Sequence, residues 1–449
     1  MLGGIVVLDA LLLAAGLLLL YGLGLVRELR EALRFSGLAL FSAWAATGIL
    51  SSLAAIFGLA LSVPELVVII AVVAIAGAGL GRRVPAASRR PALGATGVAA
   101  LVAAGGAAVL LVYLEALFRR VKLEVSTSWD AWAFWIPKAE SIIYRNGLKP
   151  GLGGFSSFAN PDYPPLGPVL DAVTFRFAGS PDPAALPLQH WIVAVAFLAG
   201  VAALLSSRVS PAILWPSLAL LALMPDFGGT IGSSLGDESL SLWIGMAGVG
   251  GALWLLERDP RYAVLCTLCT TAAALTKVEG FPAALLIVAM LAFGGGIGRW
   301  RPLALGVAAP ALALAPWRIW MHAHHVVSNS AFPYSKIVDP AFLVHRASRL
   351  GTALGTLPGY FLSVNRWLAV IPLAVALGVL VAQRRRELAV LVLGTTVLFF
   401  FGLAAIYWIS PLPVHWYIST SAARVTTSAA VFCAALFPLL LHEALRGDG

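Results

Sequence analysis

Long apolar stretches alternate with short polar ones along most of this 449-residue chain. Thirteen of these stretches are apolar enough to cross a membrane, each with room for some tilt. We expect them to be helices, because an unpaired backbone group in lipid costs too much free energy. The predicted spans are 4–26, 36–62, 64–80, 93–118, 187–206, 211–226, 238–256, 262–276, 280–298, 302–321, 367–382, 388–410 and 424–443. The pattern therefore predicts an all-α polytopic membrane protein with about 13 transmembrane helices.

The composition agrees with this fold class and excludes several others. The chain is 60% hydrophobic and only 11% charged, whereas soluble domains carry about 25% charged residues. A soluble enzyme, a disordered chain and a secreted disulfide scaffold are therefore excluded. Three cysteines cannot make a disulfide framework. Cys266 and Cys269 are expected to be small packing residues, since a metal site would need more ligands.

The distribution of basic residues predicts which connections face the cytoplasm. Arginines occupy every second connection between the predicted spans: Arg27, Arg30 and Arg34; Arg82, Arg83, Arg89 and Arg90; Arg208; Arg258 and Arg261; Arg299 and Arg301; Arg384, Arg385 and Arg386; and Arg446. The intervening short connections hold only Lys277 and Arg424. Because cytoplasmic loops carry the excess of Lys and Arg, the segments 119–186 and 323–366 are expected to face outward. The net charge of +9 then reflects topology rather than a nucleic-acid partner.

Two polar clusters fall in the first outward segment. Residues 126–140 hold three Trp together with Asp130 and Lys138. This stretch predicts a helix at the membrane interface, where Trp is enriched, and Thr127 or Ser128 would cap it. The second cluster, residues 160–166, places Asp162 and Tyr163 in a proline-rich loop. An aromatic anchor and an ordinary turn are the alternative interpretations.

Further polar residues are predicted on the same side of the membrane. They are Asp237 and Glu238 at a helix start; Lys277 and Glu279 between two spans; the cationic 318–349 region, which includes Lys336; and His415 with Arg424 before the last span. Helix-dipole compensation, snorkelling and interface anchoring would explain each cluster alone. Because all of these polar clusters are predicted on the same side of the membrane, a functional site on that side is favoured. A transporter would instead place polar groups near mid-span.

Several short segments resemble one family of membrane enzymes. They read Trp-Asp-Ala-Trp and Pro-Lys-Ala within 129–139, Pro-Asp-Tyr-Pro-Pro-Leu in 161–166, Thr-Lys-Val-Glu-Gly in 276–280, and Trp-Tyr-Ile-Ser-Thr-Ser-Ala-Ala-Arg in 416–424. Together they resemble the GT-C superfamily of integral-membrane glycosyltransferases, in particular protein O-mannosyltransferases and aminoarabinose transferases of lipid A. The resemblance covers about 120–430. The chain departs from the family in the four apolar runs before the loop, and in Ala131, where the family has a second acid.

The resemblance implies a domain organisation. Residues 1–92 would be additional N-terminal transmembrane helices, and 93–322 a GT-C-like core. The core includes the catalytic outer loop 119–186, which would carry interfacial helices. Residues 323–366 would form another outer loop, and 367–449 the C-terminal transmembrane helices.

The resemblance also implies a reaction. Asp130 would be the general base of an inverting sugar transfer from a polyprenyl-phosphate donor to an acceptor hydroxyl. Candidate substrate- and phosphate-binding residues are Lys138, Asp162, Tyr163, Lys277, Glu279, Lys336, His415 and Arg424. No metal or other cofactor is expected. The acceptor is left open among a lipid, a glycan and a protein.

The expected location is a bacterial plasma membrane, among membrane lipids, with the site facing the periplasm or the cell exterior. Two alternatives remain. One is a flippase or transporter of lipid-linked glycans. The other is a ligase of the O-antigen type, in which the 318–349 region would be central.

Overall fold

The computed structural model describes residues 1–86, 91–123, 125, 128–295, 300–327 and 334–446. Throughout this part the chain forms helices and turns, with no strand, so the predicted all-α class is confirmed. The helices are α1 (Leu2–Gly22), α2 (Leu29–Arg34), α3 (Ser36–Ile56), α4 (Val63–Gly81), α5 (Gly97–Val121), η1 (Ala131–Trp135), α6 (Ile136–Tyr144), η2 (Phe155–Ser157), α7 (Leu166–Ala178), α8 (Ala185–Leu205), α9 (Pro211–Leu223), α10 (Pro225–Thr230), α11 (Gly236–Glu257), α12 (Pro260–Thr276), α13 (Gly280–Gly295), α14 (Trp300–Ala323), η4 (Tyr334–Val338), α15 (Pro340–His345), α16 (Ala347–Phe361), α17 (Val364–Trp367), α18 (Val370–Val381), α19 (Arg386–Ala389), η5 (Val390–Gly394), α20 (Thr395–Ile409) and α21 (Val414–Leu445).

Within the described residues, nine helical segments are long and apolar enough to cross a membrane. They are α1, α3, α4, α5, α8, α11, α14, α21 and the continuous segment Arg386–Ile409. The other four predicted spans coincide with α9, α12, α13 and α18, which have only 12 to 17 residues. At about 1.5 Å per residue they are shorter than a hydrocarbon core of about 30 Å. The chain is thus an all-α membrane protein, and a total of thirteen crossings stays a prediction.

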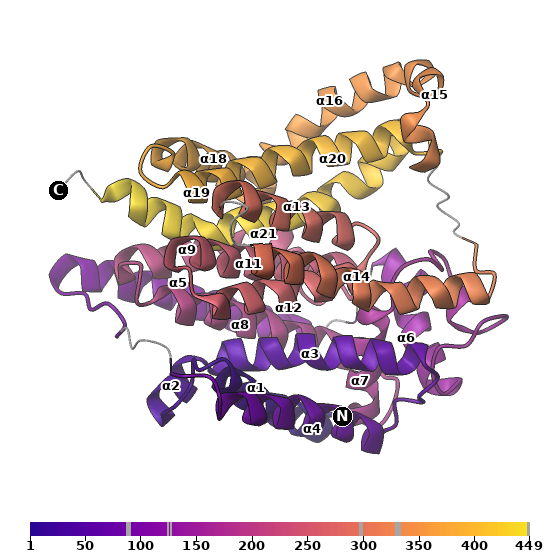
Figure 1. Ribbon diagram of the computed structural model, residues 1–449, viewed down its shortest axis with the longest axis horizontal. Helices are drawn as coiled ribbons and strands as arrows, with labels where there is room; N and C mark the ends of the chain where they lie inside the picture. Colours follow the sequence, from indigo (N-terminus) through magenta and orange to yellow (C-terminus); the bar gives the residue numbers. More distant parts are fainter. Residues whose placement is uncertain (87–90, 124, 126–127, 296–299, 328–333, 447–449) are drawn as a thin grey trace.

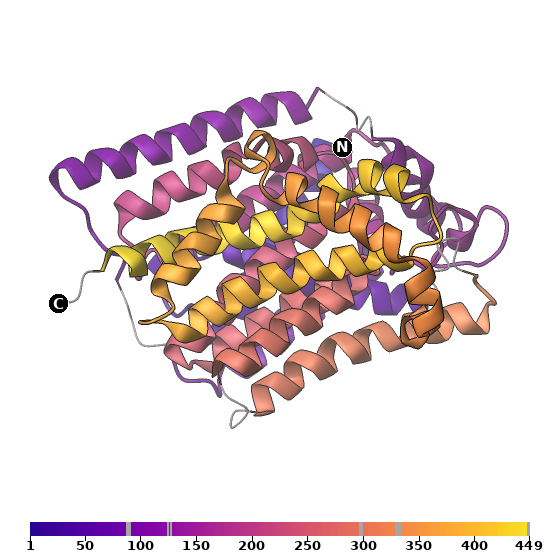
Figure 2. The same cartoon turned by 90° about the horizontal axis from the view of Figure 1, so that it is seen from above.

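Helix α11 lies at the centre of the bundle, and α1, α4 and α5 lie at its edge (Figures 1 and 2). Nineteen of the 22 residues of α11 are buried, against five of the 25 in α5. Small residues allow α21 to approach α11 closely. A Cβ atom added at Gly248 would lie 2.6 Å from the Phe432 ring, and one at Gly245 would lie 2.9 Å from Val431. Such close packing is what holds helices together in lipid.

The described parts of the arginine-rich connections gather at one end of the bundle, where α2 lies in Figure 1. Arginine side chains there donate hydrogen bonds to residues of other segments. Arg34 Nη2 donates to Ala203 O at 2.9 Å, Arg261 Nη2 to Pro85 O at 2.7 Å, and Arg385 Nε to Glu443 at 2.7 Å. Helices α6 and α15 lie at the opposite end.

The first predicted outer segment is more deeply integrated than an interfacial loop. Its helix α7 has ten of thirteen residues buried, including Asp171. The Trp-rich stretch is helical from Trp129 onward, with one π-helical turn, η1, before α6. Of the proposed capping residues, Thr127 lies outside the described residues. Ser128 O accepts a hydrogen bond from Trp132 N at 3.3 Å.

Candidate active site

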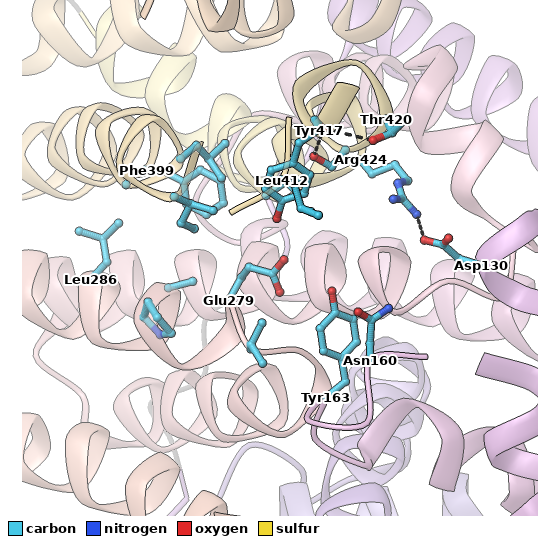
Figure 3. Close-up of a pocket in the computed structure, with 18 of the residues that line it drawn as sticks. Asp130, Asn160, Tyr163, Glu279, Leu286, Phe399, Leu412, Tyr417, Thr420 and Arg424 are labelled. Atoms are coloured by element: carbon cyan, nitrogen blue, oxygen red, sulfur yellow. Dashed lines mark hydrogen bonds and ion pairs between the residues drawn. The ribbon is translucent and has the colours of Figure 1, made fainter. Parts of the chain in front are cut away.

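A cavity of about 570 Å³ lies between the two residues that precede η1, the 160–163 loop, the first half of α13, α20 and the first half of α21 (Figure 3). This volume is within the range of small-molecule sites. Its lining residues are Trp129, Asp130, Asn160, Tyr163, Val278, Glu279, Pro282, Ala283, Leu286, Leu398, Phe399, Gly402, Leu403, Ile406, Leu412, Trp416, Tyr417, Thr420, Ser421, Arg424 and Val425. The acidic and basic groups lie at one end, while Leu286 and Phe399 line the other. The cavity thus has a charged end and an apolar groove. We call the whole cavity the apolar groove cavity.

Asp130 and Arg424 form an ion pair at the charged end, with Arg424 Nη1 donating to Asp130 Oδ2. Asp130 precedes η1, and Arg424 stands on α21, the last long helix. The Asp130 side chain is 21% exposed and that of Arg424 32%, so both remain reachable from the cavity. An arginine within a membrane-spanning helix requires a partner. Asp130 supplies that partner from a distant part of the chain.

A second charged group is centred on Lys277, in the turn between α12 and α13. Its Nζ lies 2.7 Å from Asp237 Oδ1 and 3.6 Å from Glu279 Oε1. Burial lowers the pKa of Lys277, but the charges of Asp237 and Glu279 outweigh that effect and hold it above its ordinary value. Lys277 is buried behind the cavity wall, whereas Glu279 lines the cavity. The ammonium therefore fixes Glu279 rather than reaching a ligand itself.

Tyr163 places a hydroxyl group between Glu279 and the Asp130–Arg424 pair (Figure 3). Its ring lies 5.7 Å from that of Trp135, and Lys277 Nζ lies 5.6 Å from its centre. Burial, followed by the charges of Glu279 and Asp237, holds the pKa of Tyr163 well above its usual value. The hydroxyl therefore keeps its proton and can donate a hydrogen bond to an anionic ligand.

Lys138 and Asp162 lie behind the wall and not in the cavity. The Lys138 side chain is completely buried, its Nζ donates to Asn160 O, and three aromatic rings lie within 5.8 Å of it. Burial lowers the pKa of Lys138 to about 7. Asp162 is also buried, and its backbone oxygen accepts from Trp317 Nε1 at 3.3 Å. Both residues position the 160–163 loop, and neither touches the cavity.

Lys336 and His415 lie away from the cavity. Lys336 is 54% exposed and 3.7 Å from Asp339, and His415 is exposed on the first turn of α21. Of the nine predicted site residues, Asp130, Tyr163, Glu279 and Arg424 line the cavity. Two arginines of the wider 318–349 region bind backbone groups in the described structure. Arg346 and Arg349 donate to backbone oxygens of residues 409–412, and the region includes 328–333, which lie outside the described residues.

Some residues of the site were not predicted. Tyr417 lines the cavity seven positions before Arg424, a spacing of two helical turns that places both on one face. This spacing could have identified Tyr417 as a site residue from the sequence. Outside the cavity, Asp171 and His190 were also not predicted: His190 Nε2 lies 3.1 Å from Asp171 Oδ1, and its Nδ1 lies 3.4 Å from Oε2 of Glu238, which was predicted only as part of a polar helix start. The apolar lining residues give no signal, since they resemble any membrane-spanning sequence.

The part of the chain that the structure describes holds no group of three or more His, Cys, Asp or Glu arranged to bind a metal. Cys266 and Cys269 are buried free thiols. The cavity instead offers two carboxylates, one guanidinium and tyrosine hydroxyls beside an apolar surface. These groups can bind the anionic head of an amphiphilic molecule and accept a proton from a hydroxyl group.

Comparison of the chain with known protein families, with curated proteins and with solved structures finds no match.

Proposed function

We propose that this protein is a membrane glycosyltransferase of the GT-C type. It moves a sugar from a polyprenyl-phosphate donor to an acceptor hydroxyl on the outer face of the membrane. One observation carries the proposal: the Asp130–Arg424 pair lies at the charged end of a cavity whose other end is apolar. A general base, a phosphate-binding cation and a surface for a lipid chain thus adjoin one another.

The apolar end of the cavity suits the lipid part of the donor. It is lined along α13 by Leu286 and along α20 by Phe399, Gly402 and Leu403. Gly402 has no neighbouring atom within 4 Å of the position a Cβ would take, so it leaves the groove open. A polyprenyl chain in this groove would place its phosphate near Arg424. A guanidinium has five N–H donors, so Arg424 can bind a phosphate as well as Asp130.

The reaction follows from these positions. Asp130 accepts the proton of the acceptor hydroxyl as that oxygen attacks the anomeric carbon of the sugar. The bond between the anomeric carbon and the phosphate oxygen breaks, and its electron pair leaves with the polyprenyl phosphate. Arg424 stabilises the charge that develops on the phosphate. General-base assistance of this kind contributes a factor of about 10²–10⁴.

The test uses the purified full chain in lipid nanodiscs, with a panel of radiolabelled polyprenyl-phosphate sugars and a membrane extract as acceptor. We expect the wild-type chain to transfer label from one donor, and Asp130→Asn to abolish transfer while the protein stays folded, because the asparagine oxygen can still accept a hydrogen bond from Arg424. Asp339→Asn is the matched control, because Asp339 caps α15 away from the cavity and Asn caps equally well. Full activity of Asp130→Asn would overturn the assignment. In proteoliposomes, passage of a donor with its sugar–phosphate bond intact would instead indicate a transporter.

A further inference from the structure

A second cavity, of about 390 Å³, adjoins the first at Arg424. Helices α5, α8, α10, α17 and α21 contribute to it, together with Val125, Ser128 and the turn that follows α10. Its charged lining residues are Arg120, Asp226, Arg366 and Arg424. We call it the arginine cavity.

The two cavities share one wall. Trp129 and Asp130 line the apolar groove cavity, whereas Ser128, one residue earlier, lines the arginine cavity. On α21, Thr420 faces the first cavity and Thr427 the second, while Arg424 lines both. A sugar bound at Asp130 and Arg424 therefore has the lipid groove on one side and the arginine cavity on the other. An inverting transfer requires this arrangement, since the acceptor must attack from the side opposite the departing phosphate.

The two cavities differ in charge. Among the described lining residues, the arginine cavity has three arginines and one acid, and the apolar groove cavity has one arginine and two acids. The formal charges of these residues sum to +2 in the arginine cavity and to −1 in the apolar groove cavity. Arg424 is counted in both sums. Arg366 pairs with Asp226 at 2.7 Å and is still 39% exposed. The arginine cavity therefore attracts anions relative to its neighbour.

We propose that the arginine cavity is the acceptor site, and that it takes an acceptor bearing a phosphate or carboxylate group near the hydroxyl it offers. This inference rests on the proposed function. Arg366 and Arg120 would bind the anionic group, and the hydroxyl would reach the sugar on the Ser128 side of the shared wall, next to Asp130 and opposite the phosphate. Arginine suits this task because its planar fork matches carboxylate and phosphate oxygens.

Cysteine labelling tests the charge of the cavity without any transferase activity. Gly229 lines the arginine cavity, Gly402 lines the apolar groove cavity, and a Cβ at either meets no atom within 4 Å. The three natural cysteines are buried and give little background. Gly229→Cys and Gly402→Cys are labelled with an anionic and a cationic methanethiosulfonate. Val338→Cys, 85% exposed on η4, gives the reference ratio of the two rates.

We expect the anionic-to-cationic rate ratio at Gly229→Cys to exceed the reference by about tenfold. Adding Arg366→Gln should reduce the excess, and Gly402→Cys should show none. A ratio at Gly229→Cys equal to the reference would overturn the anionic class of acceptor. Protection of Gly229→Cys by glucose 6-phosphate but not by glucose would indicate a soluble saccharide. Protection only in nanodiscs containing phosphatidylglycerol would indicate a lipid-borne anion. Protection by neither probe would overturn the acceptor site.

Blocking variants test the assignment of each cavity to one substrate. With an active donor in hand, Gly229→Trp should raise the KM for acceptor about tenfold and leave the KM for donor unchanged. Gly402→Trp should do the reverse, and Val338→Trp should change neither. An unchanged acceptor KM in Gly229→Trp would overturn the acceptor site and leave the proposed function standing. Loss of all transfer in Asp130→Asn tests the proposed function separately.

Discussion

Arg424 and Asp130, which are 294 positions apart in the chain, bind each other through a direct hydrogen bond between guanidinium and carboxylate. The pair joins α21, the last long helix, to the start of η1. Each group needs the other, because an unpaired charge at the edge of a membrane is costly. A donor phosphate would add a second anion to the same guanidinium, and Asp130 would then be freer to accept a proton.

Arg424→Gln is expected to reduce transfer strongly. The variant removes the only cation among the described residues that line the apolar groove cavity, so the departing phosphate loses its main stabilising charge. Loss of such a group lowers kcat by about 10²–10³-fold. Steady-state kinetics with the polyprenyl-phosphate donor measure the effect, and Arg366→Gln is the control for the donor KM. If kcat and donor KM of Arg424→Gln both stayed at wild-type values, Arg424 would have no role at the phosphate.

Lys277→Met is expected to destabilise the fold rather than only the reaction. The ammonium lies 2.7 Å from Asp237 Oδ1 and 3.6 Å from Glu279 Oε1, and the Lys277 and Asp237 side chains are only 7% and 4% exposed. Removing one partner of a buried pair costs about 3–5 kcal/mol, because the other charge is left uncompensated.

Thermal unfolding in detergent checks this value. The double variant Lys277→Met with Asp237→Asn should recover part of the loss, since the more closely paired carboxylate is then neutral and only Glu279, at 3.6 Å, still loses its cation. Lys336→Met, at an exposed position, should stay within about 0.5 kcal/mol of wild type. Equal effects of Lys277→Met and Lys336→Met would show that the buried pair contributes nothing to stability.

Lys138 should make stability depend on pH. Burial lowers its pKa from 10.5 to about 7, against the opposing charge of Asp162. Between these two values the unfolded chain binds more protons than the folded one, so stability rises with pH. Below pH 7 both states are protonated and the contribution is constant. The slope within the window is at most about 1.4 kcal/mol per pH unit.

Melting temperatures from pH 6 to 10 test this behaviour. Lys138→Met removes the titrating group, so the difference in stability between wild type and this variant should shift in favour of wild type as the pH rises above 7. Lys336→Met, which lacks burial, should follow wild type throughout. A difference that does not change with pH would show that Lys138 keeps an ordinary pKa in the folded protein.

The sequence predicts the helices well because lipid leaves few alternatives for the backbone. Each of the thirteen predicted ranges falls on a helix, although α9, α12, α13 and α18 are short. The sequence did not predict that helix α7, in the segment 119–186, is buried within the bundle. Its buried face depends on contacts with α3 and α8 that have no signature within 166–178 itself.

The sequence could predict site residues only where a charged residue lies beside an apolar run on the predicted side of the membrane. Asp130 and Arg424 stand out because a charge beside an apolar run needs a reason. Lys138 looked equally suitable, but its side chain turns into a cage of aromatic rings. Spacing alone does not reveal whether a lysine faces a cavity, and neither Lys138 nor Lys277 lines this one. The apolar groove and the arginine cavity arise from packing between distant helices, and no local pattern encodes them.

Glu279 is expected to bind the donor sugar. It lines the apolar groove cavity, and its Oε2 is buried with no hydrogen-bond partner among the described residues. A sugar hydroxyl donating to this oxygen would satisfy it. Hydrogen bonds to charged groups contribute about 1.5–3 kcal/mol, so Glu279→Gln should lower kcat/KM for the donor by about 10–100-fold. The fold should tolerate the change, because Lys277 keeps Asp237 as a partner at 2.7 Å. Kinetics and melting temperature are measured together, with Asp339→Asn as the control. A lower melting temperature with unchanged kcat/KM would show that Glu279 serves only to neutralise Lys277.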